Sequence, residues 1–112
     1  MKTRTLKENR DFRRVYRCGK SKAGPVLVTY ALKSRMHQSR VGITSAKKIG
    51  NAVHRNRARR VIREAFCEFE GSLCANYDIV FVARTKTTFV KMQTVREAMK
   101  AQLAELGVIA GE

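Results

Sequence analysis

The chain has 112 residues, enough for one domain with its own core, and 44% of them are hydrophobic, too many for a disordered basic tail. Lys and Arg number 24 against nine Asp and Glu, so the formal net charge is +15. This balance argues against a stand-alone enzyme for small molecules and favours a polyanionic partner. Residues 1–63 hold 19 of the basic but only two of the acidic residues. A binding surface built from the first half of the chain is therefore expected.

Neither a signal peptide nor a membrane-spanning segment is predicted. Charges of both signs fill residues 1–12, and the longest apolar run, residues 79–83, is far shorter than the ~20 residues that cross a bilayer. The three cysteines lack CxxC spacing, which argues against a disulfide framework or a zinc site and favours reduced thiols in the cytoplasm. Binding to an anionic membrane surface ranks low because the basic helix described below turns its apolar stripe to a core.

The first half of the chain predicts one helix and two strands. Apolar residues at helical spacing indicate a short, very basic helix over residues 8–18 that ends at Gly19. β-Branched and aromatic residues predict strands over 26–32 and 40–45, which a polar loop over 34–39 connects.

The clearest helical pattern follows a loop over residues 47–51. Apolar residues at i, i+3, i+4, i+7, i+8 and i+11 predict a helix over 52–70, with Asn51 as its N-cap and Gly71 at its end. These apolar residues are Ala58, Val61, Ile62, Ala65, Phe66 and Phe69.

Residues 77–83 then predict a buried strand, and residues 91–106 a last amphipathic helix closed by Gly107. The predicted fold class is α+β, a single domain over residues 1–112 in which helices pack as a sandwich on a small mixed sheet, in the order α-β-β-α-β-α. The strand at 40–45, the long helix and the strand at 77–83 form a β-α-β unit, so these two strands should be parallel. The general rule predicts a right-handed crossover for such a unit.

The long helix and the loop before it carry seven cations between residues 47 and 64. Arg55, Arg59 and Arg63 lie four residues apart, so they share one stripe opposite the apolar stripe. Arginine binds phosphate oxygens in pairs, and only Glu64 offers a local counter-charge. A charge run is ordinarily a solvated face, but the charge asymmetry and the choice of arginine favour nucleic-acid binding here.

Aromatic residues accompany the arginines of the first helix. Phe12 and Tyr16 lie four residues apart on that helix, and Tyr30 lies on the following strand, on the face shared with Val28. These side chains either pack in the core or form a shallow groove where unpaired bases stack on them. The spacing leaves both interpretations open.

Three groups of residues carry a resemblance to a known family. The central group is Lys47-Lys48-Ile49-Gly50-Asn51-Ala52-Val53, Arg55-Asn56-Arg57, Arg59-Arg60 and Arg63-Glu64. The flanking groups are Asp11-Phe12, Val15-Tyr16 and Gly19 on one side, and Tyr77-Asp78-Ile79-Val80 with Ala83-Arg84 on the other. Together they resemble the bacterial ribonuclease P protein subunit over nearly the whole chain.

The resemblance implies the non-catalytic protein subunit of an endoribonuclease whose RNA subunit removes the 5′ leader of precursor tRNA, giving the mature 5′ end. It implies Mg²⁺ held mainly by that RNA, and two partners, the catalytic RNA subunit and precursor tRNA. It also implies a left-handed crossover, against the general rule, and a short extra strand near residues 20–22, for which the residues themselves show no pattern.

The resemblance further implies two sets of site residues, one that faces RNA and one that lines a leader cleft. Arg55 and Arg59 are expected to lie near enough to the cleft to belong to both. The residues expected to face RNA are Lys47, Lys48, Arg55, Asn56, Arg57, Arg59, Arg60 and Arg63. Those expected to line a leader cleft between the first helix and the sheet are Phe12, Arg13, Tyr16, Val28 and Tyr30.

Neither catalytic residues nor a metal site are expected in the protein itself. A stand-alone nuclease needs a carboxylate cluster or a His-based acid–base pair, whereas His37 lacks acidic neighbours and His54, amid arginines, is expected to contact phosphate or pack. We expect Asp11 to set its helix and Asp78 to be a turn residue. Two further alternatives are a ribosomal-type RNA-binding protein without a processing role and a DNA-binding module using the helix at 52–70, although two strands precede that helix instead of a helix and a tight turn.

Overall fold

The computed structural model of the chain describes residues 2–110, so the predicted domain limits at residues 1 and 112 lie outside the described residues. The strands are β1 (Arg4–Thr5), β2 (Lys20–Ala23), β3 (Leu27–Lys33), β4 (Arg40–Thr44) and β5 (Tyr77–Ala83). The helices are α1 (Asn9–Cys18), α2 (Ala52–Cys67), α3 (Thr85–Phe89) and α4 (Met92–Glu105), with 3₁₀ turns η1 (Lys47–Ile49) and η2 (Glu70–Ser72). The predicted α+β fold is confirmed.

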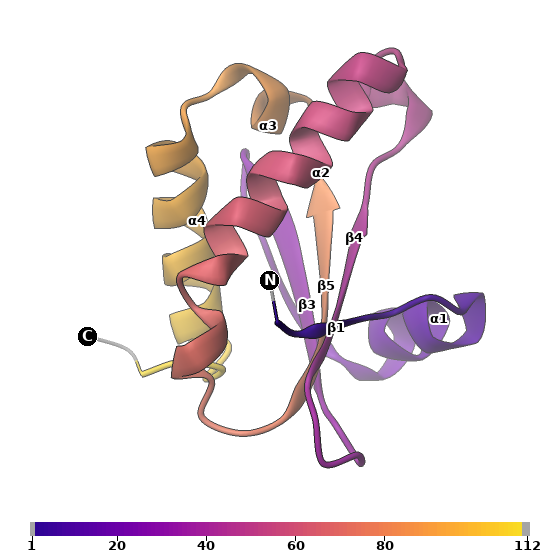
Figure 1. The fold of residues 1–112 in the computed structure, drawn as a ribbon, viewed down its shortest axis with the longest axis vertical. Helices are drawn as coiled ribbons and strands as arrows, with labels where there is room; N and C mark the ends of the chain where they lie inside the picture. Colours follow the sequence, from indigo (N-terminus) through magenta and orange to yellow (C-terminus); the bar gives the residue numbers. More distant parts are fainter. Residues whose placement is uncertain (1, 111–112) are drawn as a thin grey trace.

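The strands form one mixed sheet in the order β1-β4-β5-β3-β2. β5 runs antiparallel to β3 and parallel to β4, which confirms the predicted β-α-β unit. In Figure 1, α2 lies in front of the sheet, both strands run upward and β5 lies to the left of β4. The crossover is therefore left-handed, as the resemblance implied and against the general rule.

β5 is buried on both of its faces because helices cover both sides of the sheet. Ile79 and Phe81 face α2 and α4 and belong to the main core, where the Phe81 ring lies 5.5 Å from that of Phe66. Val80, between them, faces α1 and forms a smaller core with Leu6 and Val15. The alternation of one strand thus divides the apolar interior into two layers.

Both edges of the sheet carry short strands. β2 pairs antiparallel with β3 and is exposed along its whole length, so the extra strand implied by the resemblance is present without an alternating apolar pattern. β1 is two residues long and runs parallel to β4. Neither β1 nor the five-residue α3 was predicted. Elements this short contain little more than one repeat of a strand or helix, which is too few residues to show a periodic pattern.

The end of α2 differs from the prediction. The helix ends at Cys67, not at residue 70, and Gly71 lies in η2. The backbone N–H of Phe69 donates to the carbonyl of Phe66, a tightened turn that lets Phe69 still pack partly buried against the main core. Gly107 closes α4 as predicted, with a φ of 77° that favours glycine.

Candidate nucleic-acid interface

One buried side chain holds the loop that precedes α2. Ile49 is 4% exposed, whereas Lys47 and Lys48 beside it are exposed. Gly50 has a φ of 143°, a conformation that strains any residue with a side chain. The Asn51 side chain then accepts a hydrogen bond from the backbone N–H of the third residue of α2, at 3.1 Å, which confirms the predicted N-cap. The loop therefore presents two lysines at the beginning of the arginine-rich helix.

The arginines of α2 divide into two groups. Arg57, Arg60 and Arg63 are exposed, while Arg55 and Arg59 are half-buried. Arg55 donates to the carbonyl of Gly50 at 3.1 Å; Arg59 lies 3.5 Å from the Ser45 hydroxyl and also donates to the Asn56 side-chain oxygen. The half-buried pair is thus oriented by neighbours on the loop and on its own helix. The exposed three keep guanidinium nitrogens available to a ligand, although Nε of Arg57 lies 3.4 Å from the carbonyl of Thr88.

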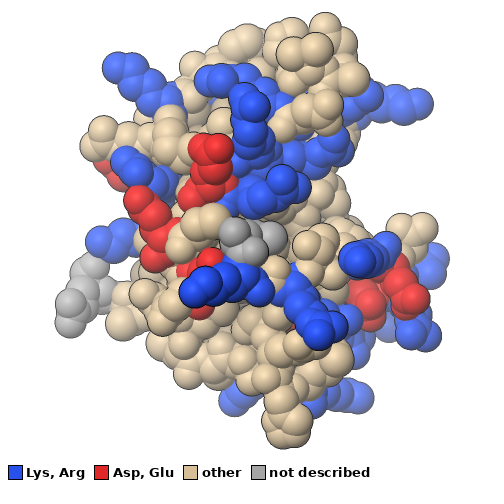
Figure 2. Space-filling view, in the orientation of Figure 1, with Lys and Arg blue, Asp and Glu red and all other residues tan. Residues whose placement is uncertain are grey.

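A shallow hollow opens along the exposed side of α2, and we call it the arginine hollow. It is lined by Val53, Asn56, Arg57, Arg59, Arg60 and Arg63. Within residues 2–110, no carboxylate forms an ion pair with these arginines, with Arg55 or with the two loop lysines. Figure 2 shows Lys and Arg side chains gathered over the upper part of α2 and acidic side chains toward its lower end. The positive charge is therefore free to meet an external anion.

The predicted cleft residues gather between α1 and the sheet. Tyr16 and Tyr30 meet edge to face, with ring centroids 4.8 Å apart and an interplanar angle of 82°. Tyr16 is 38% exposed, Val28 and Tyr30 are half-buried, and Arg13 is exposed on α1. The structure thus brings the predicted side chains to one face, where the edge of an aromatic cluster is open to solvent.

Phe12 lies against β4, because Gly42 leaves room for its ring. A Cβ added to Gly42 would lie 2.4 Å from Cε1 of Phe12, so only glycine permits this approach. Phe12 is partly buried and packs against the small core that contains Val15 and Val80. Its ring therefore serves core packing as well as the surface between α1 and the sheet.

The two predicted sets of residues meet at one place. Phe12 shares a small cavity of about 90 Å³ with Arg59 and Arg63, which reach it from α2. The other residues that line this cavity are Thr5, Leu6, Val41 and Ile43. Arg55 does not line it and instead donates to the carbonyl of Gly50. The fold therefore makes a continuous surface from the arginine hollow to the aromatic side chains of α1.

A buried ion-pair network fixes α1 on the sheet, and the expectation of a turn residue at Asp78 is wrong. Asp78 is fully buried on β5, where its carboxylate accepts from Arg14 at 2.9 Å and from Arg40 at 3.0 and 2.9 Å. Arg40 also lies 3.3 Å from Asp11, and the hydrogen bond to Asp78 is the main reason why the pKa of Arg40 is raised. An aspartate within an apolar strand was the available sequence signal, since a buried charge requires a partner.

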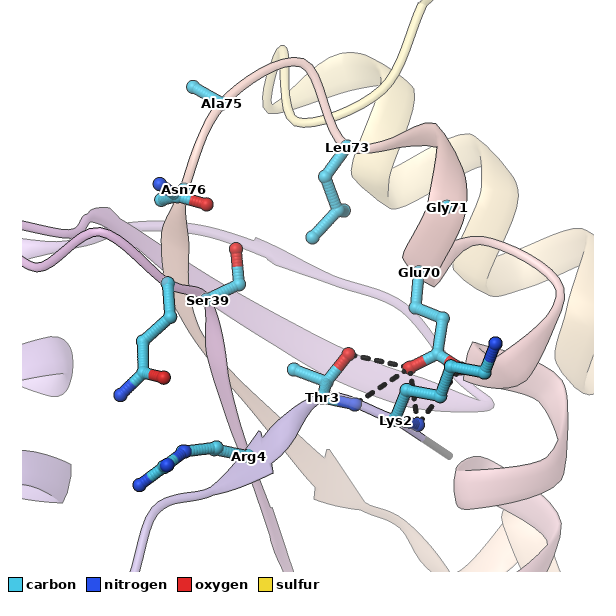
Figure 3. A pocket seen from close by; sticks show the side chains of 10 residues that line it. Lys2, Thr3, Arg4, Ser39, Glu70, Gly71, Leu73, Ala75 and Asn76 are labelled. Atoms are coloured by element: carbon cyan, nitrogen blue, oxygen red, sulfur yellow. Dashed lines mark hydrogen bonds between the residues drawn. The ribbon is translucent and has the colours of Figure 1, made fainter.

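A polar pocket holds the N-terminal segment. The Glu70 carboxylate accepts from the backbone N–H groups of Lys2 and Thr3 and, at 2.6 Å, from the Thr3 hydroxyl (Figure 3). The Thr3 hydroxyl is the main cause of a pKa for Glu70 below its usual value. Because this carboxylate binds the backbone N–H groups of residues 2 and 3, the pocket ties the start of β1 to the segment after α2.

Histidine, cysteine, aspartate and glutamate are the side chains that could hold a metal ion in this protein. Among residues 2–110, no three His, Cys, Asp or Glu side chains lie close enough together to hold a metal ion. His37 lies exposed in the loop between β3 and β4, and the His54 ring lies 6.3 Å from that of Phe89. Within the same described range, no helix is both long and apolar enough to cross a membrane.

Known proteins share both the sequence pattern and the fold. A family model described as Ribonuclease P matches residues 1–107. The ribonuclease P protein component of Clostridioides difficile (strain 630) is 42% identical over 100 residues, which cover 88% of each chain. The solved RNase P protein of Staphylococcus aureus has a TM-score of 0.85 and 31% identity, covering 96% of this chain and 99% of its own. That of Thermotoga maritima has a TM-score of 0.74 and 34% identity, covering 85% of this chain and 90% of its own.

Proposed function

The chain belongs to the Ribonuclease P protein family, and we propose that it binds the catalytic RNA of a bacterial ribonuclease P together with the 5′ leader of precursor tRNA. In this role it assists the endonucleolytic removal of the leader, which gives the mature 5′ end. The family places the chain in tRNA processing with an RNA partner. A cytoplasmic location follows from the proposal, because bacterial transcripts are made and processed there.

The observation that carries the proposal is the unneutralised charge on α2. The arginine hollow presents three exposed guanidinium groups, and no carboxylate of the described residues pairs with them. The apolar side of the same helix is fully buried at Ile62 and Phe66, so the charged side is held rigidly toward solvent. A rigid row of arginines suits the phosphates of a folded RNA better than a mobile basic tail would.

The leader is assigned to the surface between α1 and the sheet. The aromatic edge of Tyr16 and Tyr30 offers a stacking surface for unpaired bases, and Arg13 lies exposed on the same helix as Tyr16. Phe12 connects this surface to Arg59, and through it to the arginine hollow. One rigid body can thereby contact the catalytic RNA and its substrate at the same time.

The RNA subunit is assigned the chemistry. The described residues do not fit a magnesium site of their own, since no cluster of carboxylates is present among them. We therefore assign Mg²⁺ mainly to the RNA. The protein acts by position and charge: its cations reduce repulsion between two RNAs, and the leader contact raises the effective concentration of the correct substrate.

Reconstitution tests this proposal. Cleavage of a leader-bearing precursor tRNA by the cognate RNA subunit is measured at low Mg²⁺, with and without the purified chain. We expect the protein to increase cleavage and to strengthen binding of precursor tRNA over mature tRNA. A ribosomal-type RNA-binding protein would show no preference for the 5′-extended substrate, and an absence of both effects would refute the proposal.

A further inference from the structure

An exposed aromatic side chain lies beside the arginine hollow, outside both sets of residues considered so far. Phe89, the last residue of α3, is 71% exposed, and Val53 on the first turn of α2 is 73% exposed. All other phenylalanines of the chain are at least partly buried. Covering this ring with a partner would remove apolar area from water, which is favourable.

The short helix that carries Phe89 is held firmly. Thr87 and Thr88 are buried, and the Thr87 hydroxyl donates to the carbonyl of Val26, the residue before β3. The same hydroxyl accepts from the backbone N–H of Arg84 at 2.9 Å, which closes the first turn of α3. The Phe89 ring therefore projects from a fixed support, and its exposure is built into the fold.

Two residues of α2 place this ring at the rim of the arginine hollow. The His54 ring lies 6.3 Å from the Phe89 ring, tilted by 47°. Nε of Arg57 lies 3.4 Å from the carbonyl of Thr88, the residue before Phe89, and Arg57 lines the hollow. Figure 1 shows α3 beside the N-terminal half of α2. An apolar ring and phosphate-binding groups are thus adjacent on one surface.

We propose that Phe89 is a stacking platform for an unpaired base of the RNA whose phosphates occupy the arginine hollow. The inference rests on the proposed function, because it assumes that the hollow binds RNA. Every base has a π-face, and a base bound on an aromatic ring is held through its neighbouring phosphates when cations lie beside it. Phe89 has such a cation beside it in Arg57, with His54 flanking the ring as a second flat surface.

The first test measures binding of the cognate ribonuclease P RNA subunit to the Phe89→Ala variant. Loss of one stacked base should weaken binding about 5- to 150-fold. The dependence of binding on salt should keep its slope, because stacking releases no counterions. Met36→Ala, which truncates another exposed apolar side chain (46% exposed, in the β3–β4 loop), is the matched control and should bind like the unaltered protein. Thermal unfolding should shift by less than about 3 °C in both variants, because both side chains are exposed.

The second test uses the absence of tryptophan from the chain. Phe89→Trp introduces a single indole that can itself stack, so we expect affinity within about threefold of the unaltered protein, since stacking tolerates any aromatic face. The indole fluorescence should be quenched along the same titration curve as RNA binding. Met36→Trp places the indole in the β3–β4 loop and should show no such quenching.

The outcomes separate this inference from the proposed function. RNA binding that survives Phe89→Ala unchanged, or that leaves the indole of Phe89→Trp unquenched, overturns the platform alone. If Phe89→Ala flattens the slope of log affinity against log salt, the substitution has displaced the arginines. This result would also overturn the proposal that Phe89 stacks on a base. If Phe89→Ala instead abolishes self-association seen by sedimentation without RNA, a second copy covers the ring. Failure of the unaltered protein to bind the RNA overturns the proposed function and the platform with it.

Discussion

The exposed arginines of α2 should set the salt dependence of RNA binding. The perturbation is the triple variant Arg57→Ala, Arg60→Ala and Arg63→Ala, which empties the arginine hollow of its exposed charges. None of the three pairs with a carboxylate of the described residues, so no buried charge loses its partner. Alanine is the best helix former, so α2 should persist.

The structure gives the magnitude. Each neutralised phosphate contributes about 0.7 to 0.9 to the slope of log affinity against log salt, so three arginines account for about two to three units. If about six phosphates are neutralised in all, the unaltered protein should show a slope of roughly −4 to −5. A fourfold rise in salt should then cost the variant about 16- to 64-fold less affinity than it costs the unaltered protein.

The assay is a binding titration of the cognate RNA subunit between about 50 and 200 mM monovalent salt at fixed Mg²⁺. The matched control removes the same net charge elsewhere, through Lys33→Ala, Lys91→Ala and Lys100→Ala, all exposed. Its slope should stay close to that of the unaltered protein. Equal slopes for the two triple variants would refute the reasoning, because the hollow would then act only through net charge.

Three further results are expected. Phe12→Ala should weaken the binding of precursor tRNA more than that of mature tRNA when the RNA subunit is present. If both affinities fall equally at a temperature where the variant is folded, Phe12 has a packing role only. Asp78→Asn should lower the free energy of unfolding by about 3–5 kcal/mol in urea titrations, because it leaves two guanidinium groups facing a neutral, fully buried side chain; a loss below about 1 kcal/mol would show that the network contributes little to stability. The lowered pKa of Glu70 means that its stabilising contribution is complete above the pKa of the unfolded carboxyl and is lost as the pH falls through the lower folded pKa. Glu70→Gln should therefore be less stable than the unaltered protein at pH of about 7, with the difference shrinking below about pH 4, and a difference of the same size at both pH values would contradict this assignment.

Local patterns were sufficient for the long elements of this protein. The strand at 77–83 has the predicted bounds, and α2 begins after Asn51 as its capping chemistry requires. The helical spacing likewise predicted that Arg55, Arg59 and Arg63 would lie opposite the buried apolar stripe; Arg63 is exposed, whereas Arg55 and Arg59 are half-buried against their neighbours. These predictions succeeded because periodicity, capping and charge within a helix depend only on residues a few positions apart.

Tertiary structure alone decided which distant residues meet. Asp78 binds Arg14 and Arg40, which are 64 and 38 positions away in the sequence. Arg63 of α2 lines the same cavity as Phe12 of α1, at the edge of the sheet. Likewise, the exposure of Phe89 depends on how α3 packs beside α2. Register between strands and docking of helices set such contacts, and a buried charge or an exposed ring signals only that a partner is needed, leaving its identity to the fold.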